Sequence, residues 1–239
     1  TDTSYDQYGR RNTTTDPLGQ ATKYEYNPLG QPIKVTMNHV DGRPQNDLDK
    51  FNIVTEYKYD AAGRQEKTID TLGRVTFNSY DPLGRLLTST RNLLAGQPLN
   101  YQNQYNIATT FTYDRSGNQL SVTDPRNHTT HTKFDDLNRP ISVTNPNQNV
   151  RTSTYDGIGN LRLVNNGLAG STTIFSYDDL NRQTQTTDPN GNETRSLYNA
   201  KGELVLLTDA EGVVTRHEYD DLGRLTAVIE NYQAGIPAD

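Results

Sequence analysis

The chain lacks several residue types that stabilise ordinary globular proteins. It has no cysteine, no tryptophan and one methionine in 239 residues, which excludes disulfide bridges and cysteine-based metal sites. Hydrophobic residues make up only 31% of the sequence, a composition that leans toward disorder and is too sparse to fill a thick interior. No apolar run approaches the ~20 residues of a membrane-spanning helix. The net charge is −6 with both signs interspersed, so no basic stripe indicates nucleic-acid binding.

What the chain does have is a short motif that recurs about every 21 residues. An aromatic residue and Asp or Asn begin each copy, Gly or Asn follows three residues after the Asp, and Arg often comes next. Successive aromatic residues are separated by 21, 33, 21, 33, 21, 21, 22, 21 and 21 positions. The ten copies are Tyr5-Asp6 with Gly9-Arg10, Tyr26-Asn27 with Gly30, Tyr59-Asp60 with Gly63-Arg64, Tyr80-Asp81 with Gly84-Arg85, Tyr113-Asp114 with Gly117, Phe134-Asp135 with Asn138-Arg139, Tyr155-Asp156 with Gly159, Tyr177-Asp178 with Asn181-Arg182, Tyr198-Asn199 with Gly202, and Tyr219-Asp220 with Gly223-Arg224. A fixed period along the whole chain is typical of an array of one supersecondary unit.

The motif predicts a tight reversal of the chain. Asp at the first position and Gly at the fourth are typical of a type I turn that closes through a left-handed residue. The Asp side chain accepts a hydrogen bond from its own backbone two residues on, and Gly adopts positive φ without a Cβ clash. The exceptions follow the same rule, because Asn138 and Asn181 replace Gly with the next most tolerant residue.

A second set of turns with the same formula alternates with the first. Its members are Asp16 to Gly19, Asp70 to Gly73, Asp124 to Asn127, Asn145 to Gln148, Asp188 to Gly191 and Asp209 to Gly212. The six or seven residues between turns are rich in Thr, Val, Ile, Leu and Tyr, which is strand composition. The sequence therefore predicts an all-β fold: about ten antiparallel hairpins in one long sheet that twists and curls.

The domain organisation follows from the same repeat. Residues 1–239 are expected to form a single array, with long loops at 38–52 and 92–106 and the beginning of another at 231–239. The two complete loops are related by an offset of 54 residues, which pairs Gly42 with Gly96 and Asn52 with Asn106. Because the first residue is Thr1 and not methionine, we expect a piece excised from a larger protein.

The pattern also predicts how the sheet is stabilised. The apolar positions form no continuous face, so we expect a thin wall beside a wet interior and no sandwich core. The aromatic residue and the residue after Gly flank each turn, so we expect them to be cross-strand neighbours, with an Arg guanidinium over the ring where Arg is present. Two unpaired sheet edges would favour self-association of the isolated chain.

The repeats resemble the YD repeat of the RHS (rearrangement hot spot) family, over essentially the whole chain. That family includes bacterial polymorphic toxins, the shell-forming subunits of Tc insecticidal toxin complexes, and the teneurin adhesion receptors of animals. The resemblance implies a strip of hairpins that spirals into a hollow shell around a toxin or effector domain. It also implies an exported protein, secreted or on the bacterial cell surface. We find no segment that matches the autoprotease motif of the toxins, so the resemblance assigns no catalytic residue.

The remaining side chains offer no reactive site. Nucleophile-elbow, phosphate-loop and His-Glu-x-x-His motifs are absent from the sequence. His128 and His131 are three apart, a spacing that points to opposite faces of a strand, so we expect no metal there. The Asp-x-x-Gly turns lack the alternating acidic residues of calcium loops. We therefore expect no enzyme activity, no cofactor and no metal.

The sequence predicts a structural segment of a shell. Its expected partners are the rest of its own shell and an enclosed effector domain, with no nucleic acid and no membrane span. The alternative is an adhesion module, in which the tyrosine-rich faces and the loops around Gly42 and Gly96 bind a carbohydrate or a surface receptor.

Overall fold

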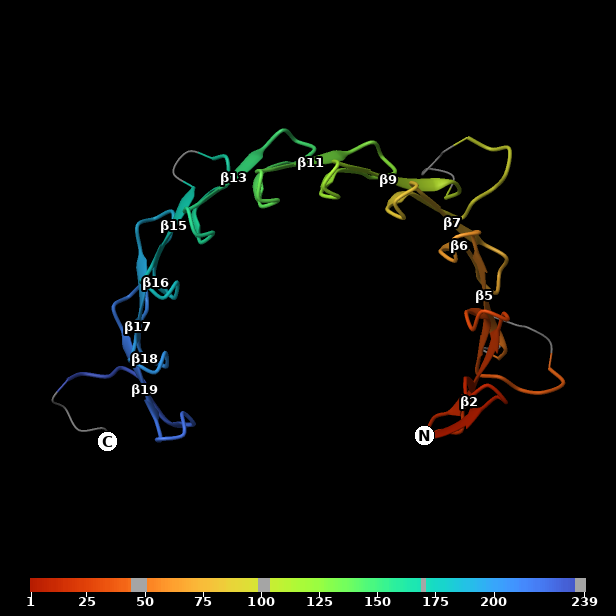
Figure 1. Cartoon of the computed structure of the whole chain (residues 1–239), viewed down its shortest axis with the longest axis horizontal. Helices are drawn as coiled ribbons and strands as arrows, with labels where there is room; N and C mark the ends of the chain where they lie inside the picture. The colour runs from red at the N-terminus through yellow and green to blue at the C-terminus, as the bar shows by residue number, and fades with distance from the viewer. Residues whose placement is uncertain (44–50, 99–103, 169–170, 235–239) are drawn as a thin grey trace. The chain divides into compact units, whose positions relative to one another are not determined.

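The computed structural model describes residues 1–43, 51–98, 104–168 and 171–234, and these residues form strands and turns without a helix. The chain divides into two compact units, Thr1–Thr129 and Thr130–Asp239. Each unit contains five hairpins, and Figure 1 shows their strands side by side in one layer. The predicted all-β array of hairpins is confirmed.

The strands of the first unit are β1 (Asp2–Tyr5), β2 (Arg11–Thr15), β3 (Ala21–Tyr26), β4 (Pro32–Met37), β5 (Ile53–Tyr59), β6 (Gln65–Ile69), β7 (Val75–Tyr80), β8 (Leu86–Arg91), β9 (Ile107–Tyr113) and β10 (Gln119–Thr123). Each strand from β2 to β9 pairs antiparallel with the strands before and after it in the sequence. The unit is therefore a simple meander, in which each described strand contacts only the strands that precede and follow it in the sequence.

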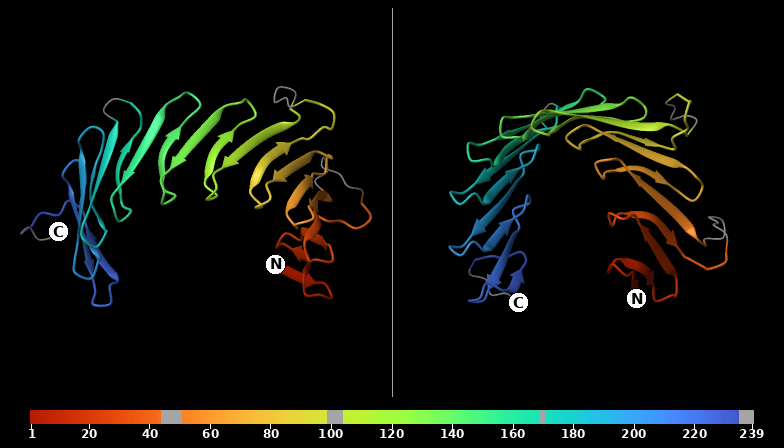
Figure 2. Two further views of the ribbon diagram at one scale, coloured as in Figure 1. Left: turned by 45° about the horizontal axis from the view of Figure 1, so that its top comes forward. Right: turned by 45° about the vertical axis from the view of Figure 1, so that its right-hand side comes forward.

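The second unit repeats this arrangement. Its strands are β11 (Thr129–Phe134), whose first residue is assigned to the first unit, β12 (Pro140–Thr144), β13 (Val150–Tyr155), β14 (Leu161–Asn165), β15 (Thr172–Tyr177), β16 (Gln183–Thr187), β17 (Glu193–Tyr198), β18 (Leu204–Thr208), β19 (Val214–Tyr219) and β20 (Leu225–Ile229). Consecutive strands again pair antiparallel. Within each unit the ribbon bends along its length (Figure 2).

The hairpins closed by the aromatic-Asp turns contain a bulge that the sequence did not reveal. Tyr59 pairs with Gln65, but Lys58 pairs with Lys67, which leaves Glu66 as an extra residue. The same shift follows every such turn, as between Tyr80 with Leu86 and Ser79 with Thr88. A bulge bends the strand and increases its twist. It also moves the third residue after Gly out of the regular alternation of faces.

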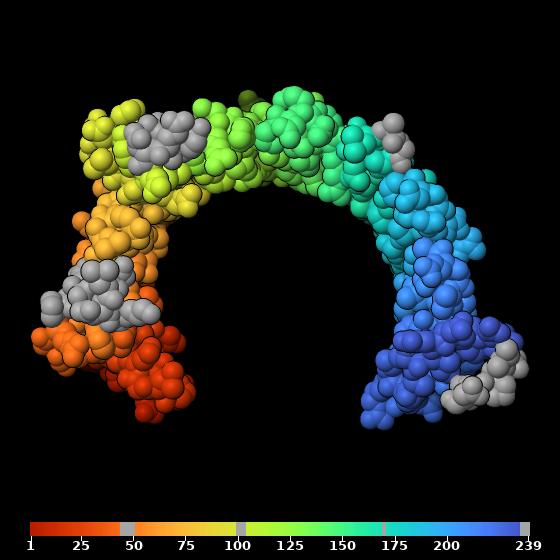
Figure 3. All heavy atoms as spheres, turned by 180° about the vertical axis from the view of Figure 1, so that it is seen from behind, coloured from red at the N-terminus to blue at the C-terminus, as the bar shows by residue number. Residues whose placement is uncertain are grey.

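Apolar burial is small in both units. The buried hydrophobic residues of the described chain are Val54, Ala108 and Val164. Figure 3 shows the strands of each unit as a band of side chains one sheet thick. Because the sheet is a single layer and no second layer packs against it, backbone pairing and the contacts between neighbouring hairpins must supply most of the stability.

Backbone geometry at the turns gives the first testable prediction. Gly84 has φ +84°, and a Cβ there would lie 3.8 Å from the Arg64 side chain. Replacing Gly84 with Val forces a β-branched residue into the left-handed region, so we expect a loss of about 1–2 kcal/mol in the free energy of unfolding. Chemical denaturation of the purified chain measures it. Gly157→Val is the matched control, since Gly157 also lies in a turn but has no positive φ and has open space around it. Equal losses in the two variants would contradict the assigned backbone conformation.

Candidate functional site

The Asp carboxylate organises each turn from within. In the turn after β5, Asp60 Oδ1 accepts hydrogen bonds from the backbone N–H groups of Ala62 and Arg64, both at 2.9 Å. The Gly63 N–H donates to the Asp60 carbonyl at 3.0 Å, and the Asp60 N–H donates to the Arg64 carbonyl at 2.9 Å. The second oxygen, Oδ2, accepts from Arg64 Nε at 2.7 Å. One side chain thus satisfies the backbone donors of the turn and also fixes the direction of the arginine.

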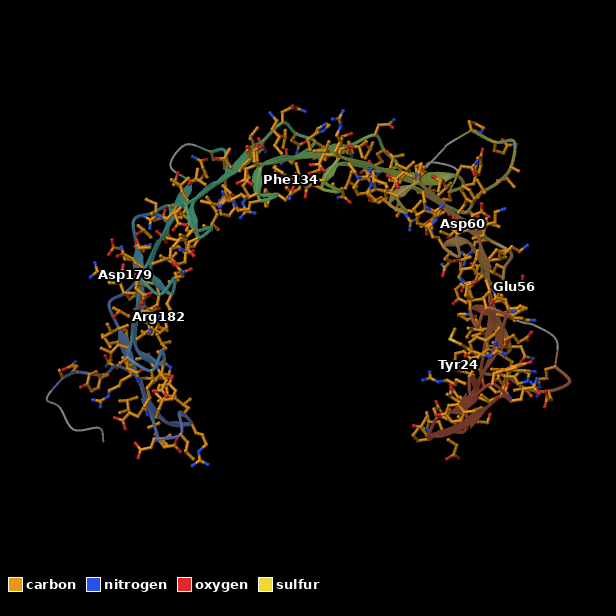
Figure 4. The ribbon with its side chains drawn as sticks, in the orientation of Figure 1. Tyr24, Glu56, Asp60, Phe134, Asp179 and Arg182 are labelled. Carbon is orange, nitrogen blue, oxygen red and sulfur yellow. The ribbon has the colours of Figure 1, made fainter. Side chains whose placement is uncertain are left out.

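The arginine then reaches the next hairpin. Arg64 Nη1 donates to the Asp81 carbonyl at 2.9 Å, and the guanidinium carbon lies 4.8 Å from the centre of the Tyr80 ring. Four other arginines make both contacts with ring distances of 4.6–4.9 Å: Arg10 with Tyr26 and Asn27, Arg85 with Tyr113 and Asp114, Arg139 with Tyr155 and Asp156, and Arg182 with Tyr198 and Asn199. We call this arrangement the inter-hairpin clamp. Figure 4 labels Asp60 and Arg182, which belong to two of the clamps.

The tyrosine completes the connection in the opposite direction. The Tyr80 hydroxyl donates to the Gln65 carbonyl of the preceding hairpin at 2.8 Å. The same bond, 2.7–3.1 Å long, is made by Tyr26, Tyr59, Tyr113, Tyr155, Tyr177, Tyr198 and Tyr219. These eight hairpins are therefore each attached to the preceding hairpin by a tyrosine hydroxyl that donates to a backbone carbonyl.

These contacts correct one prediction. We expected Arg to lie over the ring of its own hairpin as the cross-strand neighbour of the aromatic residue. The observed partner of Tyr59 is Gln65, one residue beyond Arg64. Arg64 pairs instead with the Asp60 carboxylate of its own turn and stacks on Tyr80 of the next hairpin. The reason is the turn itself, because the Asp Oδ2 holds Nε and aims the guanidinium across the gap between hairpins.

Hairpins without Arg keep a matched donor and acceptor. Where the turn begins with Asn, its amide donates to an acceptor four residues later: Asn27 to Gln31 Oε1 at 2.8 Å, and Asn199 to Glu203 Oε2 at 2.6 Å. Where it begins with Asp, the later residue is a donor, as with Asn160 at 3.0 Å. The sequence contained this signal, since the two positions change together among the ten copies.

Hydrogen bonding lowers the pKa of the Asp carboxylates in the aromatic-Asp turns below the ordinary value of 3.8. The largest cause is the Arg side-chain bond for Asp135 and Asp178, and the backbone N–H of the Arg for Asp60 and Asp220. At Asp81 burial raises the pKa, but the bonds from Arg85 and Leu83 outweigh it. The charged form of these groups is therefore the one that the fold stabilises.

The two long loops are anchored by buried asparagines. Asn106 is 2% exposed, and its amide Nδ2 donates to the carbonyls of Leu94 and Gln97 at 3.0 and 2.8 Å. Asn52 makes the equivalent bonds to Val40 and Arg43 at 3.0 and 2.8 Å. Both asparagines have positive φ. The 54-residue offset paired these positions in the sequence but gave no role to them.

The third loop begins in the same way. Asn231 has positive φ, as Asn38 and Asn92 do. The next N–H, that of Tyr232, donates to the Val214 carbonyl at 2.7 Å, which matches the bonds from His39 to Ala21 and from Leu93 to Val75. Residues 44–50, 99–103 and 235–239 lie outside the described residues, so the rest of each loop stays a prediction.

A row of apolar side chains lies at the aromatic-Asp turns. The third residue of the turn is a large apolar residue in most hairpins, and these are strongly exposed: Tyr8, Leu29, Leu83, Leu137, Ile158, Leu180 and Leu222 are 67–81% exposed. Turn chemistry does not require an apolar residue at this position. Exposed apolar patches mark contact surfaces in soluble proteins, so this edge of each unit is a candidate interface.

The described residues contain no cluster of three or more His, Cys, Asp or Glu side chains that could hold a metal ion. The His128 ring contacts Asp124 Oδ2 at 3.2 Å within its own turn, and His131 lies on β11 opposite Thr144. Two equivalent hollows of about 410 Å³ lie beneath the long loops, one lined by Asp16 and Asn38 and the other by Asp70 and Asn92. In the described part of the chain, no helix is long and apolar enough to cross a membrane.

The periodic hairpins and their clamps agree with a known family. The model of the teneurin YD-shell matches residues 1–235. The chain belongs to this YD-shell family. The resemblance found in the sequence is thereby confirmed.

Solved structures show the same fold at low sequence identity. A crystal structure of TcdB2-TccC3-TEV matches 95% of the YD-shell chain with a TM-score of 0.65 and 18% identity. The structure of the Photorhabdus luminescens Tc holotoxin pore matches 98% with a TM-score of 0.59 and 20% identity. The chain covers only 13% of the length of each of these proteins. None of the curated proteins compared with the chain matches it.

The clamp gives a stability prediction. Arg64→Ala removes the ion pair with Asp60, the hydrogen bond to the Asp81 carbonyl and the stacking on Tyr80. We therefore expect the free energy of unfolding to fall by about 2 kcal/mol. Urea denaturation measures the change. Arg115→Ala is the control, because Arg115 is exposed at a turn position and no clamp uses it. In a double-mutant cycle with Tyr80→Leu, additive effects would show that Arg64 and Tyr80 do not interact.

The lowered pKa values give a pH prediction. Deprotonated Asp60 stabilises the native turn, and in the unfolded chain its pKa returns to about 3.9. The stabilisation is therefore complete above about pH 5 and is lost as the pH falls through 3.9 toward the lower native value. We expect Asp60→Asn to melt well below the wild type at pH 7, and the difference between the two melting temperatures to shrink as the pH falls below about 4. Asp179→Asn, at an exposed turn position (Figure 4), is the control and should melt like the wild type at both pH values. A difference for Asp60→Asn that is constant with pH would contradict the prediction.

Proposed function

We propose that this chain is a wall segment of a YD-repeat shell that encloses a toxin or effector domain. The observation that carries the proposal is a single-layer sheet in which the described residues bury almost no apolar side chains. A sheet of this kind separates two aqueous spaces without needing a second layer. The segment acts through its surface and rigidity, so we assign it no catalytic activity.

The inter-hairpin clamps are compatible with a role as a shell wall. They are made between sequence neighbours only, so a strip of any length can be extended without redesigning a core. Polar strand residues facing an enclosed domain would hold it without a specific pocket. The exposed apolar residues at the aromatic-Asp turns are the surface that we assign to contact with the rest of the shell.

The wider setting is part of the same proposal. The chain spans about an eighth of the length of the Tc-related structures it matches, as expected for one portion of a much larger shell. We propose that the parent protein is exported, in keeping with a YD-shell whose solved structural neighbours are Tc toxin proteins.

Cryo-electron microscopy of the full-length parent protein tests this function. We expect these hairpins to form a stretch of continuous wall around a chamber that contains additional protein density. A solid interior, or a sheet with solvent on both faces and nothing enclosed, would refute it. A glycan array with this chain tests the adhesion alternative: a specific ligand that is lost when residues 92–106 are replaced by a four-residue turn would favour adhesion.

A further inference from the structure

One junction of the second unit departs from the clamp in a way that creates a site. Five arginines place a guanidinium 4.6–4.9 Å from the next tyrosine ring. Between the hairpins that begin at Tyr198 and Tyr219, the equivalent position is occupied by Glu203. Among the described residues, no cation lies over the Tyr219 ring, although its hydroxyl still donates to the Leu204 carbonyl at 3.0 Å. The ring and the carbonyl acceptor of a clamp are thus present without their guanidinium.

The carboxylate at this position has only a neutral partner. Glu203 Oε2 accepts from the Asn199 amide at 2.6 Å. Glu203 Oε1 lies 2.9 Å from the position of a Cβ at Gly223, so the side chain extends to the next turn just as the arginines do. Two cations also line the hollow but contact other groups: Lys201 donates to the Asp221 carbonyl at 3.2 Å, and Arg216 pairs with Glu218 at 3.0 Å. The negative charge of Glu203 is therefore not paired with a cation.

A hollow and an unpaired polar atom lie at the same place. The hollow has a volume of about 730 Å³, and Glu203, His217, Tyr219 and Asp220 are among the residues that line it. His217 is two residues before Tyr219 on β19 and therefore faces the same side of the sheet. Its Nδ1 atom is buried and has no hydrogen-bond partner in the described structure. A buried polar atom without a partner is uncommon in folded proteins, so His217 distinguishes this hollow from the rest of the described sheet.

We infer that this hollow binds the guanidinium group of an arginine side chain from another polypeptide. A planar guanidinium stacks on an aromatic face while its N–H groups donate in the plane to a carboxylate and a carbonyl, which a lysine ammonium does not reproduce. The five filled junctions show the geometry within the same chain. The ring of Tyr219 supplies the stacking face, Glu203 the charge, and the Asp220 carbonyl the second acceptor. This site does not depend on whether the parent shell encloses an effector.

Titration of the isotope-labelled chain with N-acetyl-L-argininamide tests the inference by NMR spectroscopy. We expect saturable shifts at Glu203, His217 and Tyr219, and no shifts at Tyr198, whose ring is already covered by Arg182. The lysine analogue should bind about three- to fivefold more weakly because it loses the stacking. The citrulline analogue, which has the same shape without the charge, should not bind.

Two variants separate the site from nonspecific binding. Glu203→Gln keeps the bond from Asn199, as Asn27 with Gln31 demonstrates, but it removes the charge and should weaken binding. Glu203→Arg combined with Asn199→Asp recreates the Asp–Arg pair of turns such as Asp178 with Arg182. This double variant places the chain's own guanidinium in the hollow and should abolish binding without loss of the fold, which the melting temperature verifies. Equal shifts at Tyr198 and Tyr219, equal binding of the citrulline analogue, or unchanged binding by the double variant would each overturn the inference.

Discussion

The hydrogen-bonded Asp carboxylate at the head of each turn is the group on which the rest of this structure depends. With one oxygen it satisfies two backbone N–H groups and closes the reversal of the chain. With the other it holds the Nε of an arginine and directs the guanidinium to the next hairpin. The local turn and the contact between repeats therefore share one side chain. Where Asn replaces Asp, the partner four residues later changes from donor to acceptor, which shows that the pairing is required more than the charge.

This constraint explains how a chain with so few apolar residues folds. A globular domain stabilises itself with a thick core, but the buried hydrophobic residues described here are Val54, Ala108 and Val164. In the described residues, arginine stacking with its charge-assisted hydrogen bonds recurs at five junctions and the tyrosine hydroxyl bond at eight. Their modest individual contributions add along the strip. The faces of the sheet carry many polar side chains as well as exposed apolar ones such as Ile174 and Leu197. A polar single-layer wall is what a YD-shell segment needs, and the fold and the proposed role have the same physical origin.

Departures from the repeat are where specific chemistry becomes possible. The long loops occur at the sheet edge and are held by Asn52 and Asn106, whose buried amides replace the missing turn. Glu203 departs in another way, because it keeps the pairing within its turn but removes the cation that would cover Tyr219. The long loops change the shape of the sheet edge. The change at Glu203 leaves a charged, aromatic hollow in the sheet surface.

The sequence alone determined the positions of the turns, the antiparallel hairpins, the family and the absence of a large core. It could do so because Asp, Asn and Gly specify a turn through contacts within four residues, and the sequence contains ten copies of this turn motif. Only the tertiary structure decided that Arg64 stacks on Tyr80 of the next hairpin, and that Glu66 forms a bulge. It also showed that Asn106 is buried as a loop anchor. These features depend on which strand lies across each gap and on where the side chains point toward it, and the turn residues do not specify either.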